Sequence, residues 1–534
     1  MNYQGQFKLI NRKFAFTLIT IIFIVTFGSL FFIHNHSLIA HDESLYGYRA
    51  RLILENNDWF TPFEKAHHKT IGSYWPAAVS LKILGINEFS ARLPSYLFSI
   101  SAQVVLFTII KLLSNYQIAL ISVFSLQSSY LWFSYSNYCS PDTLYIFLNL
   151  LGILHLLKIN HFSKDRVNNR NLFISGLFFA LPFFVRSYMQ LLPLISISPL
   201  IFIKLKRFNF INYRYFLFGL LAGLLPLIIF YYLSFRTYGL ESFTRPFMLL
   251  HGKTLTENDI FEGIIFYPRN LILFCVPFFI FVFNGSKYIY KNMSSEVKIL
   301  FIFSPLINVL LLMLTASKYS HYGLFTIPLL ASNASFGIYE CFKNNSFSSK
   351  LTLRFFGGFN LIICSTILLS FFFRSKFEIF NSFTLIELSL ICIFLLISIY
   401  FSLTLLFKAN LTRLNFNKII SIFSIQIIFL ALLFANGIIG NPNNDFKYFL
   451  NNGAVNEIIN KNRIFLIGKL DDKLLHLLKF YLPKYKKIGI DDVNTKDIIY
   501  GIISDSEVSK LNNVEKNSFS IIQEFKNINL VKIN

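Results

Sequence analysis

Long apolar segments separated by short polar ones constrain this chain more than any other feature of its sequence. The first of them, residues 14–33, contains no charged residue. As a helix rising about 1.5 Å per residue, it is long enough to cross the roughly 30 Å hydrocarbon core of a bilayer. Of the 534 residues, 54% are hydrophobic and only 14% are charged. Soluble proteins carry far more charge. The solvent for most of this chain is therefore lipid.

Further apolar segments of similar length follow the first, which gives about thirteen candidate transmembrane helices. They are residues 14–33, 96–113, 117–135, 142–158, 171–187, 189–204, 215–235, 268–284, 298–316, 322–340, 353–373, 382–407 and 418–436. We therefore predict an all-α polytopic membrane protein. Pro182 and Pro193 interrupt the pair at 171–187 and 189–204. A merged or re-entrant pair is the alternative there, and it would reverse the orientation of everything downstream.

The placement of basic residues indicates the orientation of these helices. The formal net charge is +22, and the cations lie in short clusters between apolar segments rather than on one face, which does not favour nucleic-acid binding. When the spans alternate in direction, the basic clusters at 164–170, 204–214, 287–291, 343–350 and 408–413 all lie in the cytoplasm, as the positive-inside rule requires. The first loop (34–95), a loop near 236–267 and the tail then lie outside. We expect a multi-pass protein of the inner cell membrane, in contact with membrane lipids, whose active site lies on the extracytoplasmic side.

The last part of the chain differs in character from the rest. Four segments are typical of short strands, and two others of helices: 463–468, 487–490, 498–504 and 519–533, and 471–481 and 507–511 respectively. We predict a small extracytoplasmic α/β domain, residues 441–534, after a transmembrane domain, residues 1–440. It lacks a nucleophile motif, a metal-ligand cluster and a Gly-rich phosphate loop. We therefore expect it to shape access or to contact a partner.

The first loop carries the clearest chemical signal. Asp42 and Glu43 follow the first apolar segment by about eight residues, near the interface, where adjacent acids are costly unless they are solvated or used. The segment 46–54 is amphipathic and can lie in the interface. A basic patch ending at Lys69 precedes another such segment near 74–76. Acid and base are thus brought to the same membrane level, although a solvated carboxylate pair is the alternative.

The sequence of this loop resembles a known family. It contains D-E-x-x-Y, A-R, N-D-W-x-x-P, H-x-K, Y-W and G-x-N-E-F-S-A-R-L-P-S, in this order, within residues 41–95. This pattern resembles the first outer loop of the GT-C membrane glycosyltransferases, specifically the superfamily of aminoarabinose transferases and protein O-mannosyltransferases. About thirteen helices followed by an outer domain are similar to the aminoarabinose transferase branch. The resemblance covers the whole chain in outline and is sharp in the first third.

The resemblance implies a hexosyl- or pentosyltransferase that uses a polyprenyl-phosphate-linked sugar. The acceptor would be a glycolipid such as lipid A, a glycan or a protein. In that family the aspartate of the Asp-Glu pair acts at the acceptor, which makes Asp42 the general base and Glu43 its helper. Lys69 stands where the family has a Lys-Pro-Pro motif that holds the carrier phosphate. Thr70 and Ile71 replace the two prolines, so the cation is kept and the stiff turn is lost.

Three further segments resemble the family's site positions. Asp142, in SNYCSPDTL, resembles the second acidic position, and the alternative is a helix N-cap. Arg186 follows a long apolar run, where an unpaired cation is costly, so we predict that it binds the carrier phosphate; the alternative is snorkelling to the interface. Lys318, His321 and Tyr322, in SKYSHYGLFTIP, resemble a late outer motif that also faces this phosphate. An ordinary loop is the alternative there.

A polyprenyl phosphate holds its sugar at the membrane interface, so no nucleotide-sugar fold is required, and no Rossmann fingerprint is present. A single in-line displacement would invert the anomeric configuration. We expect no required cofactor and assign no metal ligands. A divalent cation held by His41, His67, His68 and Asp42 is the alternative, although adjacent histidines in a loop are more often solvated.

A transporter or flippase of lipid-linked sugars is the alternative function. Its ionisable residues would lie near the bilayer midplane, and its two halves would be related as repeats. Here the ionisable residues gather at one face and no internal repeat is present.

Overall fold

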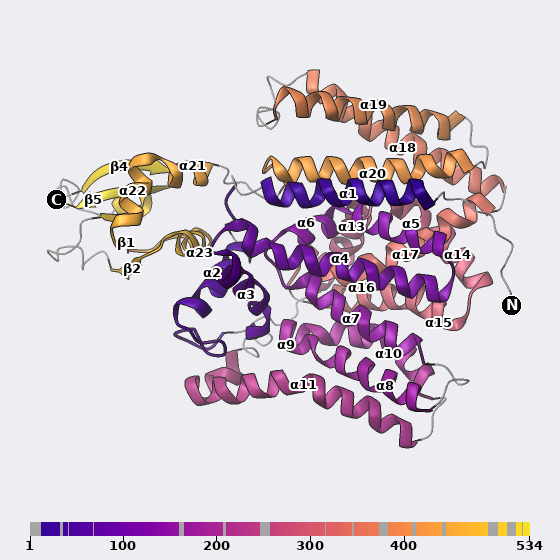
Figure 1. Ribbon diagram of the computed structural model, residues 1–534, viewed down its shortest axis with the longest axis horizontal. Coiled ribbons are helices and arrows are strands. Elements are labelled where there is room, and N and C mark those ends of the chain that lie inside the picture. The colour runs from indigo at the N-terminus through magenta and orange to yellow at the C-terminus, as the bar shows by residue number, and fades with distance from the viewer. Residues whose placement is uncertain are drawn as a thin grey trace.

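The computed structural model describes residues 12–32, 36–40, 42–67, 69–159, 165–206, 210–245, 257–315, 317–343, 346–372, 383–407, 413–439, 445–489, 500–509, 519–525 and 527–533. Long helices run side by side in a bundle, and a small sheet domain lies beyond one end of it (Figure 1). We call this end of the bundle the domain end. The predicted fold class, a helical membrane protein with a small C-terminal α/β domain, is confirmed.

The helices of the first half have the following bounds: α1 Arg12–Phe32, α2 Asp42–Glu55, η2 Ile71–Ser73, α3 Trp75–Leu84, α4 Glu88–Leu113, α5 Tyr116–Gln127, α6 Tyr130–Asn137, α7 Asp142–Leu157, α8 Asp165–Ala180, α9 Pro182–Arg186, η3 Ser187–Gln190, α10 Leu191–Leu205 and α11 Phe210–Tyr238. Those of the second half are α13 Glu257–Phe274, η4 Phe278–Phe281, α14 Val282–Asn292, α15 Ser295–Lys298, η5 Ile299–Phe303, α16 Ser304–Met313, η6 Ser320–Phe325, α17 Thr326–Lys343, α18 Phe347–Phe372, α19 Leu385–Phe407 and α20 Arg413–Ala435.

Within the described ranges, seven helical stretches are long and apolar enough to cross a membrane, or nine if each of two bent pairs is one span. This is fewer than the roughly thirteen predicted. Residues 14–33 and 117–135 contribute only the shorter apolar helices Phe16–Phe31 and Tyr116–Gln127. In addition, the two predicted spans at 171–187 and 189–204 fall within one apolar stretch, Asn168–Leu205.

That apolar stretch is folded back on itself. Its two long helices, α8 and α10, are joined at the domain end by α9 and η3 (Figure 1). Ser187 has a φ of 52°, a region that non-glycine residues rarely adopt, and it marks the tight turn. Lys204, near the end of α10, donates to the Ile159 carbonyl, which precedes α8, at 3.4 Å. Because both outer ends of this hairpin lie together, the structure supports two spans rather than the merged alternative.

Glycines allow α8 to approach α11 closely. A Cβ at Gly219 of α11 would lie 2.0 Å from the carbonyl oxygen of Phe173 in α8. A Cβ at Gly176 of α8 would lie 2.2 Å from the carbonyl oxygen of Phe216. Real Cβ atoms do not approach so closely, so only glycine fits at these positions. This contact fixes the hairpin that carries Arg186.

The C-terminal domain is a five-stranded sheet with helices, in strand order β2-β1-β3-β5-β4. Strand β1 pairs in parallel with β2 and β3, while β5 is antiparallel to β3 and β4. The bounds are α21 Asp445–Asn451, α22 Gly453–Lys461, β1 Ile464–Ile467, α23 Asp472–Tyr481, β2 Tyr485–Ile488, β3 Tyr500–Ser504, α24 Asp505–Val508, β4 Phe519–Phe525 and β5 Ile528–Ile533. The predicted closing strand is a hairpin of two strands. The predicted boundary at 440/441 lies outside the described residues and stays a prediction.

The first loop and the C-terminal domain pack against each other. The guanidinium of Arg51, in α2, donates to the backbone carbonyls of Phe480 at 2.7 Å and Pro483 at 3.2 Å. The Tyr481 hydroxyl donates to Glu88 of α4 at 2.8 Å. Apolar side chains of α2, α3, α21 and α23 form one buried cluster. Helix α2, which begins at Asp42, is therefore held between the bundle and the C-terminal domain.

Candidate active site

A cavity of about 320 Å³ opens at the domain end of the bundle. It lies among the start of α2, the segment before η2, the turn between α9 and η3, and η6. Four residues of the predicted site line it: Asp42, Lys69, Arg186 and Tyr322. A smaller cavity of about 130 Å³ is also lined by Asp42 and Arg186, and it adds Glu43 and Asp142. The structure thus brings together acids and bases that lie far apart in the sequence.

Asp42 and Lys69 face each other across the larger cavity. Asp42 is the first residue of α2, and the Lys69 ammonium lies 3.4 Å from one of its carboxylate oxygens. The same ammonium donates a hydrogen bond to the Tyr46 hydroxyl at 3.0 Å and lies 4.4 Å from the centre of that ring. Tyr46 is one helical turn after Asp42, so both side chains lie on one face of α2. Lys69 is therefore within reach of the base predicted from the sequence.

Arg186 and Asp142 form a direct ion pair in this region. Their side chains are only 11% and 5% exposed, so Arg186 does not snorkel to water. Asp142 also accepts a hydrogen bond from the Ser140 hydroxyl at 2.5 Å. The N-cap position of α7 is occupied by Pro141, and at this end the Ser140 hydroxyl accepts a hydrogen bond from the backbone N–H of Asp142 at 3.2 Å. The capping alternative for Asp142 is therefore wrong, and its carboxylate serves to hold Arg186.

The Tyr46 hydroxyl joins the two cations. It accepts hydrogen bonds from Lys69 at 3.0 Å and from Arg186 at 3.2 Å. Burial raises the pKa of Tyr46 well above its usual value, although the positive charge of Arg186 opposes this shift. The side chain therefore stays a neutral phenol that spaces the two cations. Sequence reasoning missed this role, and the Asp-x-x-x-Tyr spacing is the signal that could have found it.

Glu43 lines the smaller cavity, but its carboxylate is held by other partners. Its carboxylate binds the Arg92 guanidinium at 2.7 and 2.9 Å, and both side chains are 2% exposed. The backbone amides of Ile39 and Cys139 also donate to it, at 2.8 and 2.9 Å. These bonds satisfy both carboxylate oxygens. Glu43 thus fixes the start of α2 against α4 and the segment before α7, and its predicted role as a helper at the acceptor stays a prediction.

The late motif contributes Tyr322 to the cavity but not Lys318. The Lys318 ammonium donates to the backbone carbonyls of Met313, at 3.2 Å, and Thr315, at the end of α16. His321, the third residue of this predicted motif, lines both cavities, and its ring centre lies 4.7 Å from that of Tyr322. Burial lowers the pKa of His321 to about 4, against the opposing effect of Asp142. This imidazole is therefore neutral near pH 7.

Within the described residues, no group of three His, Cys, Asp or Glu side chains is arranged to hold a metal ion. Two members of the alternative set, His41 and His68, lie outside the described residues. His67 shares a hydrogen bond of 3.1 Å with the Tyr74 hydroxyl through its Nδ1 atom.

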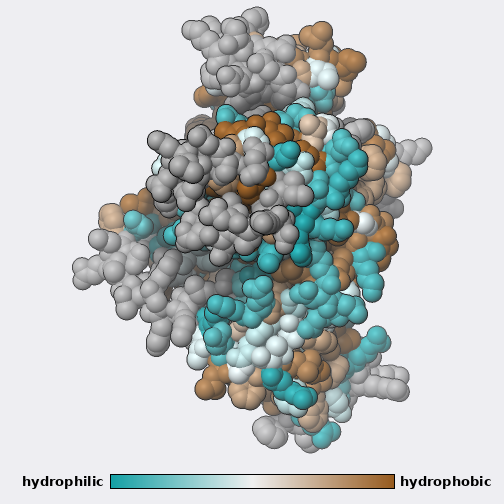
Figure 2. Space-filling view, turned by 90° about the vertical axis from the view of Figure 1, so that its left-hand side faces the viewer, coloured by the Kyte–Doolittle hydropathy of each residue, from teal (hydrophilic) through white to brown (hydrophobic). Residues whose placement is uncertain are grey.

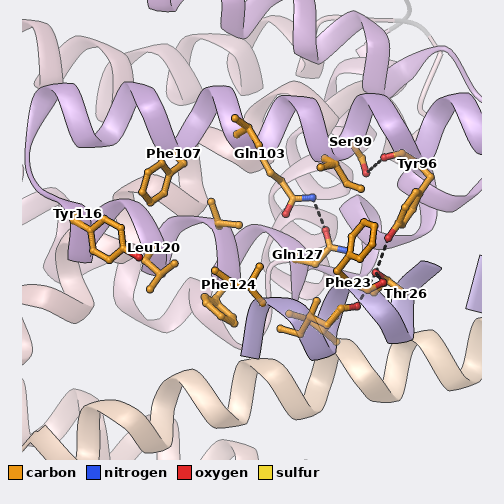
Figure 3. Close-up of a pocket in the computed structure, with 16 residues that line it drawn as sticks. Phe23, Thr26, Tyr96, Ser99, Gln103, Phe107, Tyr116, Leu120, Phe124 and Gln127 are labelled. Atoms are coloured by element: carbon orange, nitrogen blue, oxygen red, sulfur yellow. Dashed lines mark hydrogen bonds between the residues drawn. The ribbon is translucent and has the colours of Figure 1, made fainter. Parts of the chain in front are cut away.

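A separate pocket of about 330 Å³ lies among α1, α4 and α5 (Figure 3). Its polar contacts join Gln103 to Gln127 at 2.8 Å and Thr26 to Tyr96 at 2.9 Å. Its lining includes neither a carboxylate nor a basic side chain. Acid–base chemistry therefore belongs to the cavities at the domain end.

Comparison with solved structures identifies the fold. The structure matches the crystal structure of ArnT from Cupriavidus metallidurans in the apo state, with a TM-score of 0.74 over 97% of this chain and 98% of that one, at 13% sequence identity. The chain has the GT-C fold of the aminoarabinose transferases. The same protein bound to undecaprenyl phosphate matches equally well, with a TM-score of 0.74 and 12% identity over 98% of both chains.

Sequence comparisons agree with this GT-C fold. Residues 68–232 match the family described as dolichyl-phosphate-mannose-protein mannosyltransferase. The chain is also 26% identical, over 207 residues, to the undecaprenyl phosphate-alpha-4-amino-4-deoxy-L-arabinose arabinosyl transferase of Wigglesworthia glossinidia brevipalpis. That match spans 38% of this chain and 36% of the length of the relative. The predicted resemblance to the superfamily of aminoarabinose transferases and protein O-mannosyltransferases is confirmed.

Proposed function

We propose that this chain is a glycosyltransferase that moves a sugar from a polyprenyl-phosphate carrier to an acceptor hydroxyl. One observation carries the proposal. Asp42 and Asp142, together with Lys69 and Arg186, line two neighbouring cavities that share Asp42 and Arg186, at the domain end of the bundle. Glycosyl transfer from a phosphate carrier needs a base at the acceptor and positive charge at the departing phosphate. The likeness to an arabinosyl transferase and to an undecaprenyl-phosphate-bound structure supports the choice of donor.

The reaction follows from these positions. Asp42 takes the proton of the acceptor hydroxyl as its oxygen attacks the anomeric carbon. The bond between that carbon and the phosphate oxygen breaks, and the electron pair leaves with the polyprenyl phosphate. Lys69 and Arg186 neutralise the charge that develops on this phosphate. A single displacement of this kind inverts the anomeric configuration, because base and leaving group lie on opposite faces of the sugar.

The contacts of Lys69 and Arg186 in the structure are compatible with this reaction. At 3.4 Å, the contact between Lys69 and Asp42 is longer than an ordinary hydrogen bond of a charged pair. A phosphate that enters the cavity attracts Lys69 and leaves Asp42 available as a base. Asp142 keeps Arg186 in place, so the site need not reorganise when the donor binds.

We propose undecaprenyl phosphate as the carrier and a pentose as the first sugar to test, since the arabinosyl transferase relative is named for both. A hexose is the second. The acceptor is a glycolipid, a glycan or a protein. α15 lies at the end of the bundle opposite the C-terminal domain (Figure 1), and its Glu296 pairs with the basic side chain of Lys204 at 2.9 Å. We take this basic end as cytoplasmic, so that the cavity faces the extracytoplasmic side of the inner membrane.

The decisive experiment compares two aspartates of the same loop. Full-length protein is reconstituted with undecaprenyl-phosphate-linked aminoarabinose and an acceptor lipid, and release of undecaprenyl phosphate is measured. Asp42→Asn should lower kcat by about 10² to 10⁴ and leave donor binding intact. Asp58→Asn is the matched control, because Asp58 accepts hydrogen bonds from Phe60 and Thr61 in a turn outside the cavity lining. Equal activity of Asp42→Asn and wild type would refute the proposal.

The proposed chemistry requires no cofactor. Turnover should therefore persist in EDTA, because Lys69 and Arg186 supply the positive charge. Loss of turnover in EDTA, with recovery on adding Mg²⁺ or Mn²⁺, would instead establish a divalent cation in the site.

A further inference from the structure

His321 lies where the two cavities of the proposed active site meet. Of the described residues, three line both the larger and the smaller cavity: Asp42, Arg186 and His321. The proposed reaction uses the first two, as the base at the acceptor and as a cation at the departing phosphate. The anomeric carbon must lie between these two groups during transfer. Hydrophilic side chains gather on this end of the molecule (Figure 2). His321 therefore borders the place of the polar donor sugar.

The imidazole of His321 is packed against three aromatic rings. Its centre lies 4.7 Å from that of Tyr322, 5.4 Å from that of Tyr135 and 5.6 Å from that of Tyr319. Tyr322 belongs to η6, which Tyr319 directly precedes, and Tyr135 belongs to α6. Because these contacts come from two separate parts of the chain, they restrict the rotation of the imidazole. Its two nitrogens therefore keep fixed directions.

The ring nitrogens of His321 are available to a molecule in the cavities. The side chain is only partly buried, and neither nitrogen forms a hydrogen bond within the described part of the chain. Polar groups inside a protein are usually hydrogen-bonded to protein, water or ligand. The lowered pKa of this side chain, about 4, keeps the ring neutral near pH 7. One nitrogen then carries a hydrogen and donates, while the other accepts.

A third cavity, of about 20 Å³, also borders His321 and gives a direction to its N–H group. Asn308 of α16 lines this cavity and is only 1% exposed. Its amide nitrogen donates to Thr326 at 2.8 Å, but its Oδ1 atom has no partner among the residues that the structure describes. A space of this size holds about one water molecule. Such a water would accept from the imidazole and donate to Asn308, which leaves the other ring nitrogen as an acceptor toward the two larger cavities.

We propose that His321 determines specificity for the donor, because its imidazole accepts a hydrogen bond from the sugar hydroxyl on the carbon next to the anomeric carbon. The inference rests on the proposed function, since it assigns a further part of the same site. This hydroxyl is the one nearest the bond that breaks. In glycoside hydrolysis, hydrogen bonds to it strengthen in the transition state. The donor is therefore a sugar with a free hydroxyl at this carbon, and His321 acts on the rate of transfer as well as on binding.

The test removes each partner of this hydrogen bond in turn. Full-length wild type and His321→Phe receive undecaprenyl-phosphate-linked aminoarabinose or its 2-deoxy counterpart, and donor binding and release of undecaprenyl phosphate are measured. Phenylalanine keeps a flat ring among the tyrosines but has no nitrogen, whereas His321→Asn keeps a polar side chain. His155→Phe is the matched control, because His155 lies in α7 outside the lining of the three cavities.

The quantity that decides is the preference between the two donors, because a 2-deoxy sugar also reacts at a different intrinsic rate. The ratio of their kcat/KM values should shift by about ten- to a hundredfold toward the 2-deoxy donor in His321→Phe, mostly through kcat. His321→Asn should keep part of the wild-type preference, and His155→Phe should keep all of it. A His321→Phe variant with the wild-type preference would overturn the inference, whatever its overall activity.

Carrier binding separates this inference from the proposed function. His321→Phe should bind undecaprenyl phosphate with wild-type affinity, because Lys69 and Arg186 hold the phosphate, and this result also shows that the variant is folded. If wild type uses both donors but His321 has no effect on the preference, the transferase assignment stands and this inference fails. If wild type uses neither donor, but binds them with a difference that His321→Phe removes, the sugar site stands and the transferase assignment fails.

Discussion

Glu43 and Arg92 form a buried ion pair with two hydrogen bonds, at 2.7 and 2.9 Å, and neither side chain reaches solvent. Removing one partner of such a pair leaves an unpaired charge in a region without water, which costs about 3–5 kcal/mol. The neighbouring Asp42 is 36% exposed, lines the cavity, and is paired with Lys69 rather than with a fully buried cation.

Glu43→Gln should therefore lower the free energy of unfolding by a few kcal/mol, whereas Asp42→Asn should leave it nearly unchanged. Thermal unfolding of the detergent-solubilised proteins, followed by tryptophan fluorescence, measures the difference. A Glu43→Gln variant that is as stable as wild type but inactive would show that Glu43 acts in the chemistry.

Arg186→Lys should weaken binding of undecaprenyl phosphate by about tenfold and lower kcat. Lysine keeps the charge but cannot reach Asp142 and the Tyr46 hydroxyl at the same time, as the guanidinium does. Binding of radiolabelled undecaprenyl phosphate and single-turnover rates check both effects. Arg354→Lys, at an exposed position of α18, is the control. Unchanged carrier affinity in Arg186→Lys would exclude Arg186 from the phosphate site.

Lys69→Met should reduce carrier affinity strongly, while Lys318→Met should affect it little. Both lysines were predicted from the sequence to face the phosphate, but the Lys318 ammonium donates to carbonyls at the end of α16 and does not line the cavity. The same carrier-binding measurement compares the two variants. Similar losses in both would mean that Lys318 turns toward the phosphate when the carrier binds.

His321 should make the protein more stable as pH rises from about 4 to 6.5. Burial lowers its pKa to about 4 in the folded protein, against an ordinary value near 6.5, so the unfolded chain binds the extra proton. Stability is thus complete above the unfolded pKa and falls as pH drops toward 4, by about 3 kcal/mol at most. His321→Asn should flatten this slope in unfolding experiments across that range. An equal slope in the variant would assign the pH dependence to other groups.

Much of the site could be predicted because the first loop carries it in consecutive residues. Asp42 and Lys69 lie 27 residues apart, and their contact needs only the short helix α2 and the loop that follows it. The prediction of Arg186 needed a further argument, namely that a cation after an apolar segment is costly without an anionic partner. Asp142 is that partner in the structure. The geometry of Lys318 could not be predicted, since a lysine can reach either a ligand or the carbonyls that end the preceding helix.

The fold was predicted in class more securely than in detail. Hydropathy finds segments of the right length, and the boundary that it gives between 171–187 and 189–204 is where the chain turns back at Ser187. In the C-terminal domain the sequence patterns predicted the strands at β1 and β3 and the helix at α23. The helices α21 and α22 were not predicted, since their polar faces resemble a loop in sequence.

The hydrogen bonds from Arg51 to the backbone carbonyls at the end of α23 join α2 to the C-terminal domain. The C-terminal domain therefore supports the helix that positions Asp42. A chain truncated before this domain would keep the residues that line the two cavities and yet lose the surface that packs against α2.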